Sequence, residues 1–323
     1  MMTNSRRKFL KGSLTTMAAR SLWSTEAEQS APRGATGEGS RQEPMRVSVL
    51  SYSFRGLMQE GKMDIFGFME TCKYRYHLDA ADLWSGFIPN TEDAYLKKLK
   101  EGLDERELIV PNIAVDGAQV WEDAPEKRQQ CYERALTFLN AGRILGARFV
   151  RVDAGGGRQA REWTNEQFDH IVKRYKEYAQ YAYDHGFKAG AESHWGPEAY
   201  WPSMQQLYKA VNHPGFAICC HIGGWQGTPE EKDAADRESA PWVAHTHIAW
   251  NITEGSLVEK MTNLRNANYQ GYYNVEHHSG RDEYAEVGIQ IAKVRSVLQS
   301  WRSGGTGAPS TSSPQPRPPA AKK

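Results

Sequence analysis

The chain alternates short apolar runs with amphipathic stretches between Met45 and Trp301, and this order limits its fold more than any other feature. The apolar runs have the length of buried strands. There are eight of them, at residues 47–51, 80–84, 108–114, 149–153, 189–192, 216–221, 243–249 and 273–276. Strands that alternate with helices predict a parallel sheet, because parallel neighbours need a long crossover connection between them.

Eight such units within residues 45–302 fit a closed barrel better than an open sheet, since a (β/α)₈ barrel takes roughly 250 residues. No G-x-G-x-x-G sequence follows the first apolar run, which weakens the case for a dinucleotide-binding fold. We therefore predict an α/β fold in which residues 45–302 form a single domain, a (β/α)8 TIM barrel.

Three segments carry the signals of a helix start. Asn90 opens a run of polar side chains that can cap free N–H groups. Thr164 and Gln167 have the spacing of a capping box. Pro125, followed by Glu126, suits the first turn of a helix, where Pro needs no N–H and an acid favours the helix dipole.

The two ends of the chain differ in composition from the barrel segment. Residues 5–11 read SRRKFLK, which resembles a twin-arginine export signal, although residues 12–24 form a short apolar region that contains Arg20. We expect residues 1–44 to be an export signal with a polar linker, and hence a periplasmic protein. A basic head without an export role is the alternative. Residues 303–323 are rich in Gly, Ser and Pro, so we expect a disordered tail.

Composition narrows the range of partners. With 40 Lys and Arg against 39 Asp and Glu, the chain lacks the charge excess of a nucleic-acid-binding domain. Its apolar runs fall short of the roughly 20 residues that span a bilayer, so we expect no stable membrane insertion. The spacing of the cysteines matches no zinc or redox motif, and we interpret all four as structural thiols: Cys72, Cys131, Cys219 and Cys220.

Candidate ligands gather at the ends of the last four predicted strands. Glu192 ends the fifth, His221 the sixth and Glu276 the eighth, while the seventh carries His245 and His247. The C-terminal ends of barrel strands meet at one mouth, where functional groups collect. Single residues of these types are usually capping or packing groups, but carboxylates packed together repel each other and lose solvation. A bound cation relieves both costs, so we predict one divalent metal ion on Glu192, His221, His247 and Glu276.

The mixed set of carboxylates and imidazoles favours Mn²⁺, with Co²⁺, Fe²⁺, Zn²⁺ or Mg²⁺ as alternatives, over Ca²⁺, which takes oxygen ligands. A structural barrel without a metal stays an alternative. Other residues near the strand ends are candidates for contact with a substrate, each with a structural role as its alternative: His194, Trp195, His245, His278, Asp82, Arg151, Asp153 and Trp225. For Arg151 and Asp153 the alternative is a pair with each other.

With these residues the chain resembles the xylose-isomerase-like TIM barrel superfamily over about residues 46–300. Its usual marks are a Glu on strand five, an Asp on strand six, a His-x-His on strand seven and a Glu on strand eight. Glu192, His247 and Glu276 match this pattern, while His221 stands where relatives have the Asp. The resemblance implies a sugar isomerase or epimerase in which Glu192 and Glu276 bind the metal and also carry protons.

Two further departures separate the chain from ketose 3-epimerases of the superfamily. Gly224 stands where they have a substrate-binding His, and Thr253 where they have an Arg. Endonuclease IV relatives are also disfavoured, because the chain shows no basic groove.

The same acidity of a C–H beside a carbonyl also serves elimination, so a lyase that cleaves 3-keto-glycosides is the alternative. A second alternative is a non-catalytic sugar-binding barrel. We expect a small-molecule sugar or glycoside without phosphate as the partner, because no Gly-rich phosphate cradle follows strands seven and eight. A homo-oligomer stays open, since relatives often pair.

Overall fold

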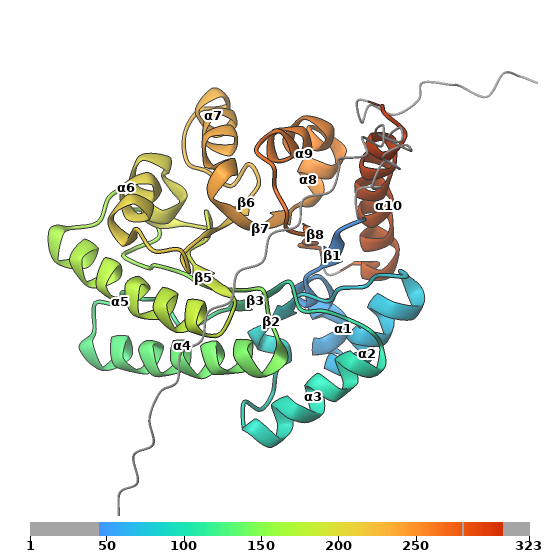
Figure 1. Cartoon of the computed structure of the whole chain (residues 1–323), viewed down its shortest axis with the longest axis horizontal. Helices are drawn as coiled ribbons and strands as arrows, with labels where there is room; N and C mark the ends of the chain where they lie inside the picture. The colour runs from blue at the N-terminus through green and yellow to red at the C-terminus, as the bar shows by residue number, and fades with distance from the viewer. Residues whose placement is uncertain (1–44, 280, 306–323) are drawn as a thin grey trace, which may run out of the picture. The chain divides into compact units, whose positions relative to one another are not determined.

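The computed structural model describes residues 45–279 and 281–305, and Figure 1 shows their strands in the middle with the helices around them. The strands are β1 (Val47–Val49), β2 (Leu83–Trp84), β3 (Asn112–Val115), β4 (Phe149–Val152), β5 (Lys188–Gly190), β6 (Ile218–His221), β7 (Val243–Ile248) and β8 (Tyr273–Val275). The α-helices are α1 (Arg55–Gln59), α2 (Ile65–Glu70), α3 (Asp93–Glu105), α4 (Pro125–Leu145), α5 (Asn165–Asp184), α6 (Trp201–Val211), α7 (Pro229–Ser239), α8 (Trp250–Glu254), α9 (Leu257–Asn266) and α10 (Glu283–Arg302). At least one helix follows each strand, which confirms the predicted alternation.

The strands form two parallel sheets, ordered β1-β8-β7-β6 and β2-β3-β4-β5. Isolated bridges join their edges, because Leu50 pairs with Asp82 between β1 and β2, and Ala189 pairs with Phe216 between β5 and β6. The sheet therefore closes on itself, and the predicted α/β fold, a (β/α)8 TIM barrel, is confirmed. Closure gathers the C-terminal ends of all these strands at one mouth.

The third strand is shorter than the sequence predicts. Its apolar run covers residues 108–114, but β3 begins at Asn112. Pro111 has no N–H to donate to a strand ladder, so the regular pairing begins after it. Ile109 keeps only an isolated bridge to Ala80.

All three predicted helix starts are confirmed, although one lacks the expected side-chain cap. Thr164 accepts a hydrogen bond from the N–H of Gln167, whose side chain accepts from the N–H of Thr164, and this capping box opens α5. Pro125 is the first residue of α4. The prediction for Asn90 as a cap is wrong, because α3 has Glu92 as its N-cap residue, without a side-chain cap. Asn90 instead accepts from the N–H of Glu92 at 2.7 Å, which stabilises the turn before the helix.

Alternate residues of the strands fill the inside of the barrel. Phe149 and Cys219 precede Arg151 and His221 by two positions, so each pair shares the inner face of its strand. Phe149 and Cys219 are buried together with Ala217 in a small apolar cluster of their own. Cys219 pairs with His245 of β7, so the cluster reaches the level directly below the side chains at the mouth.

A buried polar layer lies at the level of Cys219, which pairs with His245. Ser48 and Asn274 both donate a hydrogen bond to Oδ2 of Asp82, and Nε2 of His245 lies 3.6 Å from the other oxygen of Asp82. His245 precedes His247 on β7 by two positions, so this layer lies one step below the side chains at the mouth. The level directly below the mouth thus holds both apolar and polar side chains.

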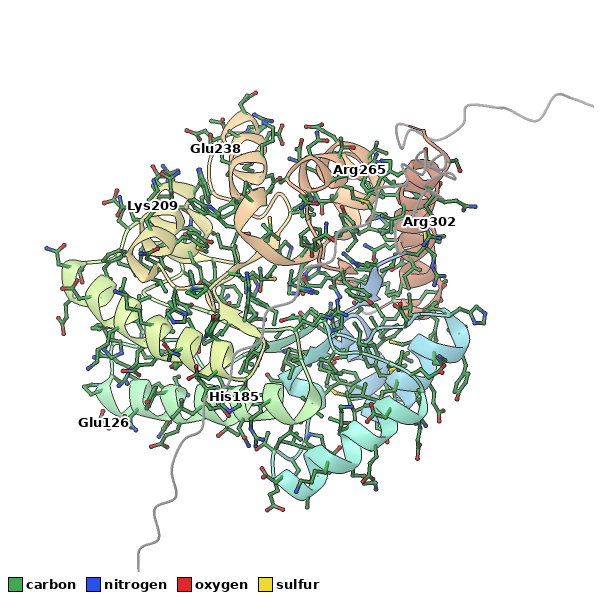
Figure 2. The ribbon with its side chains drawn as sticks, in the orientation of Figure 1. Glu126, His185, Lys209, Glu238, Arg265 and Arg302 are labelled. Atoms are coloured by element: carbon green, nitrogen blue, oxygen red, sulfur yellow. The ribbon has the colours of Figure 1, made fainter. Side chains whose placement is uncertain are left out.

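The outer faces of the helices carry the charged side chains, and Figure 2 shows Glu126, Lys209 and Glu238 pointing away from the strands. No helix among residues 45–279 and 281–305 is long and apolar enough to cross a membrane. All four cysteines are buried free thiols, as predicted. The predicted export signal and linker at 1–44 lie outside the described residues, as does the predicted tail beyond residue 305.

The junction of β5 and β6 gives a test of barrel closure. A Cβ atom on Gly190 would lie 1.8 Å from the carbonyl oxygen of Ala217. We expect Gly190→Ala to force these strands apart and to lower the free energy of unfolding by about 3 kcal/mol, the upper end for overpacked sites. Urea unfolding followed by circular dichroism measures this loss.

Gly288→Ala is the matched control. Gly288 lies in α10, and a Cβ there meets its nearest neighbour, Cε1 of Tyr76, at an ordinary 3.5 Å. Alanine favours a helix by up to about 1 kcal/mol over glycine, so this variant should be as stable as the parent or more so. Equal stability of both variants would contradict the tight junction.

Candidate metal centre

Backbone pairing beyond β5 sets the position of Glu192. The sequence predicts a strand over 189–192, but β5 ends at Gly190, and Glu192 keeps only an isolated bridge to Cys219. The next residue, Ser193, accepts a hydrogen bond from the N–H of His221 at 2.9 Å. These contacts hold Glu192 beside the end of β6, so that its side chain faces that of His221.

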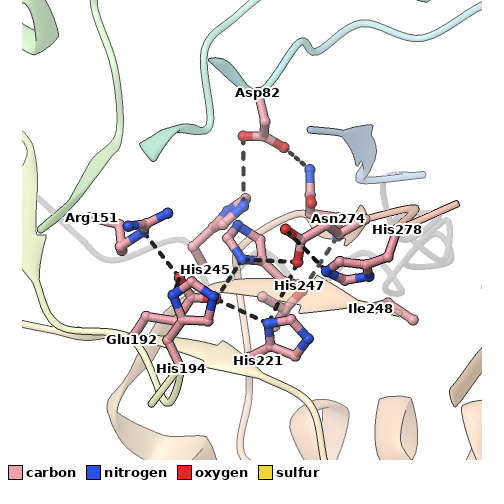
Figure 3. A network of polar contacts seen from close by, with 12 residues as sticks. Asp82, Arg151, Glu192, His194, His221, His245, His247, Ile248, Asn274 and His278 are labelled. Atoms are coloured by element: carbon pink, nitrogen blue, oxygen red, sulfur yellow. Dashed lines mark hydrogen bonds and ion pairs between the residues drawn. The ribbon is translucent and has the colours of Figure 1, made fainter. Parts of the chain in front are cut away.

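The four predicted ligands come together at the mouth of the barrel (Figure 3). Oε1 of Glu192 lies 2.7 Å from Nδ1 of His247 and 3.2 Å from Nδ1 of His221. Oε2 of Glu276 lies 3.5 Å from each of these nitrogen atoms. One atom from each of the four residues thus lies within 4.8 Å of all the others.

These distances fit a shared ion. Ligand atoms that lie about 2.1 Å from one cation are separated by roughly 3.0–3.5 Å in octahedral or tetrahedral geometry. The four donors have close to this spacing, and Oε2 of Glu276 is buried without a hydrogen-bond partner. His247, Glu192 and Glu276 are all buried. The residues present therefore fit a divalent metal ion.

The electrostatics of the cluster favour a positive charge at its centre. Burial raises the pKa of Glu192, but the imidazoles of His247 and His194 and the guanidinium of Arg151 lower it well below its usual value. The pKa of Glu276 is likewise lowered by His247 against the effect of burial. Burial lowers the pKa of His247, but Cys219 and the two carboxylates raise it well above the ordinary value. Both carboxylates are therefore ionised at neutral pH.

Arg151 lies beside the cluster as a buried cation. Its Nη1 donates to Asp153 at 2.8 Å and to Asp116 at 3.0 Å, and its Nε forms an ion pair with Oε2 of Glu192 at 3.0 Å. Of the alternatives that the sequence leaves open, the pairing of Arg151 with Asp153 is thus the one observed. Burial opposes the charge, but Asp153, Asp116 and Glu192 raise the pKa of Arg151 well above its ordinary value.

Asp82 and His245, predicted as substrate contacts, lie below the mouth in the polar layer. Their exposed fractions are 0% and 1%, so burial argues against direct contact with a substrate. Burial raises the pKa of Asp82 to about 7 and lowers the pKa of His245 well below its usual value. The two groups form the floor beneath His247.

The mouth contains a cleft of about 270 Å³ next to the four ligands. Four predicted contact residues line it, His194, Trp195, His278 and Arg151, together with Glu276. His194 stacks on Trp195 with 3.6 Å between ring centroids, while the side chain of His278 is 46% exposed at the rim.

Four residues of the cleft are absent from the sequence-based prediction, Leu50, Tyr52, Trp84 and Asp116. Each lies at or just after the C-terminal end of an early strand, so the strand-end rule that singled out the last four strands could have found them. Nε1 of Trp84 donates to Asp116 at 2.8 Å, which fixes the indole ring as a wall of the cleft.

Trp225, a predicted sugar-stacking residue, does not reach the cleft. It is 1% exposed, and its Nε1 donates to Asp236 at 2.9 Å. The prediction is wrong because the indole turns inward from the loop after β6. The carboxylate of Asp236 also accepts from the N–H of Gly223 and pairs with the buried Lys260, and these contacts hold the loop that follows His221.

The structure gives physical reasons for the two departures from ketose 3-epimerases. A Cβ on Gly224 would lie 2.8 Å from the carbonyl oxygens of His221 and Ser193, so this backbone has no room for a histidine side chain. Thr253 is buried in α8 and accepts a hydrogen bond from Gln290 of α10. Neither position can contact a substrate in the cleft.

A protein-family comparison matches residues 71–296 to the model of the xylose isomerase-like TIM barrel. The chain belongs to this family. The match covers most of the barrel, including the four residues of the metal centre. No protein of curated function matches the chain in sequence.

Solved structures of low sequence identity share the fold of this family member. One is 3-keto-D-glucoside 4-epimerase YcjR from E. coli, with 16% identity and a TM-score of 0.61 over 78% of this chain and 99% of that chain. Another is the probable 3-DHS dehydratase AsbF from Bacillus anthracis, with 14% identity and a TM-score of 0.58 over 77% and 98%. A third is a xylose isomerase-like TIM barrel protein from Mycobacterium smegmatis in complex with magnesium, with 14% identity and a TM-score of 0.60 over 72% and 87%.

The metal centre predicts a specific effect of removing one imidazole. We expect His247→Ala to lower the affinity for Mn²⁺ at least tenfold, because the change removes one ligand and leaves two carboxylates facing each other. Isothermal titration of metal-free protein with Mn²⁺ measures this effect. His185→Ala, on the exposed end of α5, is the matched control and should bind like the parent. Equal affinities in all three proteins would contradict the role of His247.

Proposed function

We propose that this protein is a divalent-metal-dependent sugar isomerase or epimerase that removes a proton next to a carbonyl group. The observation that carries the proposal is the pair of ionised carboxylates, Glu192 and Glu276, on a cluster of four metal donors beside a cleft. A 3-keto-D-glucoside 4-epimerase and a probable 3-DHS dehydratase share this fold. Epimerisation and dehydration both move a proton from carbon.

The cleft favours a sugar without phosphate. Among the described residues that line it, the one arginine is Arg151, whose guanidinium already pairs with Asp116, Asp153 and Glu192. A phosphate would therefore find no unpaired arginine in the cleft, whereas Trp84 lines it with an indole ring of the kind that sugars contact. The predicted export signal at residues 1–44 supports the same substrate class, since an exported enzyme meets glycosides more often than cytosolic sugar phosphates.

Glu276 is the group best suited to remove the proton. It lines the cleft, and the histidines around it keep its carboxylate ionised. When bound, the metal ion supplies Lewis-acid stabilisation for the negative charge that develops on the substrate oxygen. His278, whose Nε2 lies 3.6 Å from Oε1 of Glu276, can hold a substrate hydroxyl at the rim. In an isomerase or epimerase Glu192 returns the proton on another carbon or face.

A lyase that cleaves 3-keto-glycosides by β-elimination is the second candidate. One observation favours it: Glu192 has no exposed surface, and its second oxygen is paired with Arg151. Elimination needs only one base to remove the proton at C2. The electrons of the C2–H bond then form a C1–C2 double bond, and the group on C1 leaves with the electron pair of its bond to C1. Glu276 alone can serve that step.

A panel of substrates in D₂O separates the two candidates. Metal-loaded protein is incubated with free ketoses, glycosides and 3-keto-glycosides, and the products are followed by NMR. We expect deuterium to enter the carbon next to the carbonyl without loss of the C1 group. Release of the C1 group would favour the lyase, and no reaction with any sugar would contradict the proposed function.

Glu276→Gln tests the proposed base in the same assay. The amide keeps the shape of the side chain but cannot accept a proton, so we expect turnover to fall by at least 10²-fold with sugar binding retained. Glu166→Gln, on the exposed first turn of α5, is the matched control and should keep full turnover. Sugar binding without turnover in the parent protein would instead support a non-catalytic sugar-binding barrel.

A further inference from the structure

Glu192 belongs to two clusters of possible metal ligands. Its Oε1 faces the imidazoles of the metal centre. Its Oε2 faces Asp153 and His194, and these two residues form the second cluster together with Glu192. One atom from each of these three residues lies within 4.8 Å of the other two. Oδ1 of Asp153, Oε2 of Glu192 and Nδ1 of His194 are buried without hydrogen-bond partners. The donors alone would suit a second cation bridged to the first by Glu192.

The guanidinium of Arg151 lies against the same oxygens. Its Nε is 3.0 Å from Oε2 of Glu192, and its Nη1 is 2.8 Å from Oδ2 of Asp153 (Figure 3 shows its pairing with Glu192). Oδ2 of Asp153 also lies 3.6 Å from Nδ1 of His194. A metal ion on these donors would sit about 2.1 Å from each oxygen, within a few ångströms of a fixed positive charge.

The register of the strands holds the guanidinium there. Arg151 pairs with Ala114 of β3 and with Gly190 of β5, two positions before Asp116 and Glu192. Nη1 also donates to the carbonyl oxygen of Val115, the last residue of β3, at 3.1 Å and to the carboxylate of the next residue, Asp116, at 3.0 Å. The arginine is 3% exposed, and these contacts from both neighbouring strands fix its guanidinium in place.

We propose that Arg151 replaces a second metal ion in this site. The chain binds one divalent cation, on Glu192, His221, His247 and Glu276, and the guanidinium acts as the second positive charge shared by Glu192 and Asp153. It is a positioning residue, because its Nε pairs with one oxygen of Glu192 and leaves the other turned toward the metal centre. Removing its charge opens a second cation site on Asp153, Glu192 and His194.

This inference rests on the proposed metal centre, and counting bound ions tests both separately. Metal-free protein is titrated with Mn²⁺ alone, and bound ions are counted by elemental analysis after gel filtration. We expect one equivalent for the parent protein and two for Arg151→Met, which removes the charge but fills similar space. Electron paramagnetic resonance should then show the broadened signal of two Mn²⁺ ions coupled through the shared carboxylate.

Three further variants complete the design. Arg151→Lys keeps a positive charge and should bind one equivalent. Asp153→Asn in the Arg151→Met background should return the count from two to one. Arg174→Met is the matched control, because this arginine stacks on Tyr132 of α4 and pairs with Glu177 on α5. It should bind one equivalent, like the parent protein.

The outcomes distinguish the two claims. One ion in both the parent and a folded Arg151→Met variant would overturn the inference and leave the metal centre standing. No bound ion in the parent would overturn both. If Arg151→Met fails to fold, the parent protein and its Asp153→Asn variant decide the matter. Two ions in the parent, with the second lost in Asp153→Asn, would overturn the inference. One ion in the parent, with the same count in Asp153→Asn, supports it.

Discussion

The buried charge of Glu192 is the constraint around which the mouth of the barrel is organised. An ionised carboxylate with no exposed surface is costly unless cations or hydrogen-bond donors surround it. On one side it has the imidazoles of His221 and His247, and on the other the guanidinium of Arg151. The charge therefore stays on the carboxylate, and its two oxygens have different surroundings. One oxygen faces the metal centre and the other is fixed in place.

The layers below explain why this arrangement is held rigidly. Cys219 of the apolar cluster and His245 of the polar layer pair with each other, and each lies two residues before a metal donor on its strand. Side chains on one face of a strand follow each other by two residues, so the closed sheet sets the height of every side chain. The metal donors thus stand on a packed floor, and their positions depend on the register of the barrel.

Much of this was predictable from the sequence. The repeated order of apolar runs and helices predicts the barrel, and the strand-end rule brings Glu192 and Glu276 to one mouth. Strand boundaries are less certain, because Pro111 and the close approach at Gly190 change the pairing locally. The inward turn of Trp225 depends on Asp236, which lies eleven residues away and is visible only in the fold.

The surroundings of Arg151 were beyond sequence reasoning for a similar reason. A strand-end arginine two residues before an aspartate suggests either a substrate contact or a local pair. Its contacts with Asp116 and Glu192 come from neighbouring strands, and they follow from the register of β3, β4 and β5. Periodicity predicts that these strands exist but does not predict how far each is shifted against the next.

The most direct test of the metal centre is the anomalous diffraction of crystals grown with Mn²⁺. The account predicts one strong peak at the mouth, about 2.0–2.3 Å from one donor atom each of Glu192, His221, His247 and Glu276. His221 decides the outcome most sharply, because it stands where related barrels have an aspartate. A peak bound elsewhere, or a peak at the mouth that His221 does not contact, would contradict the four-residue centre.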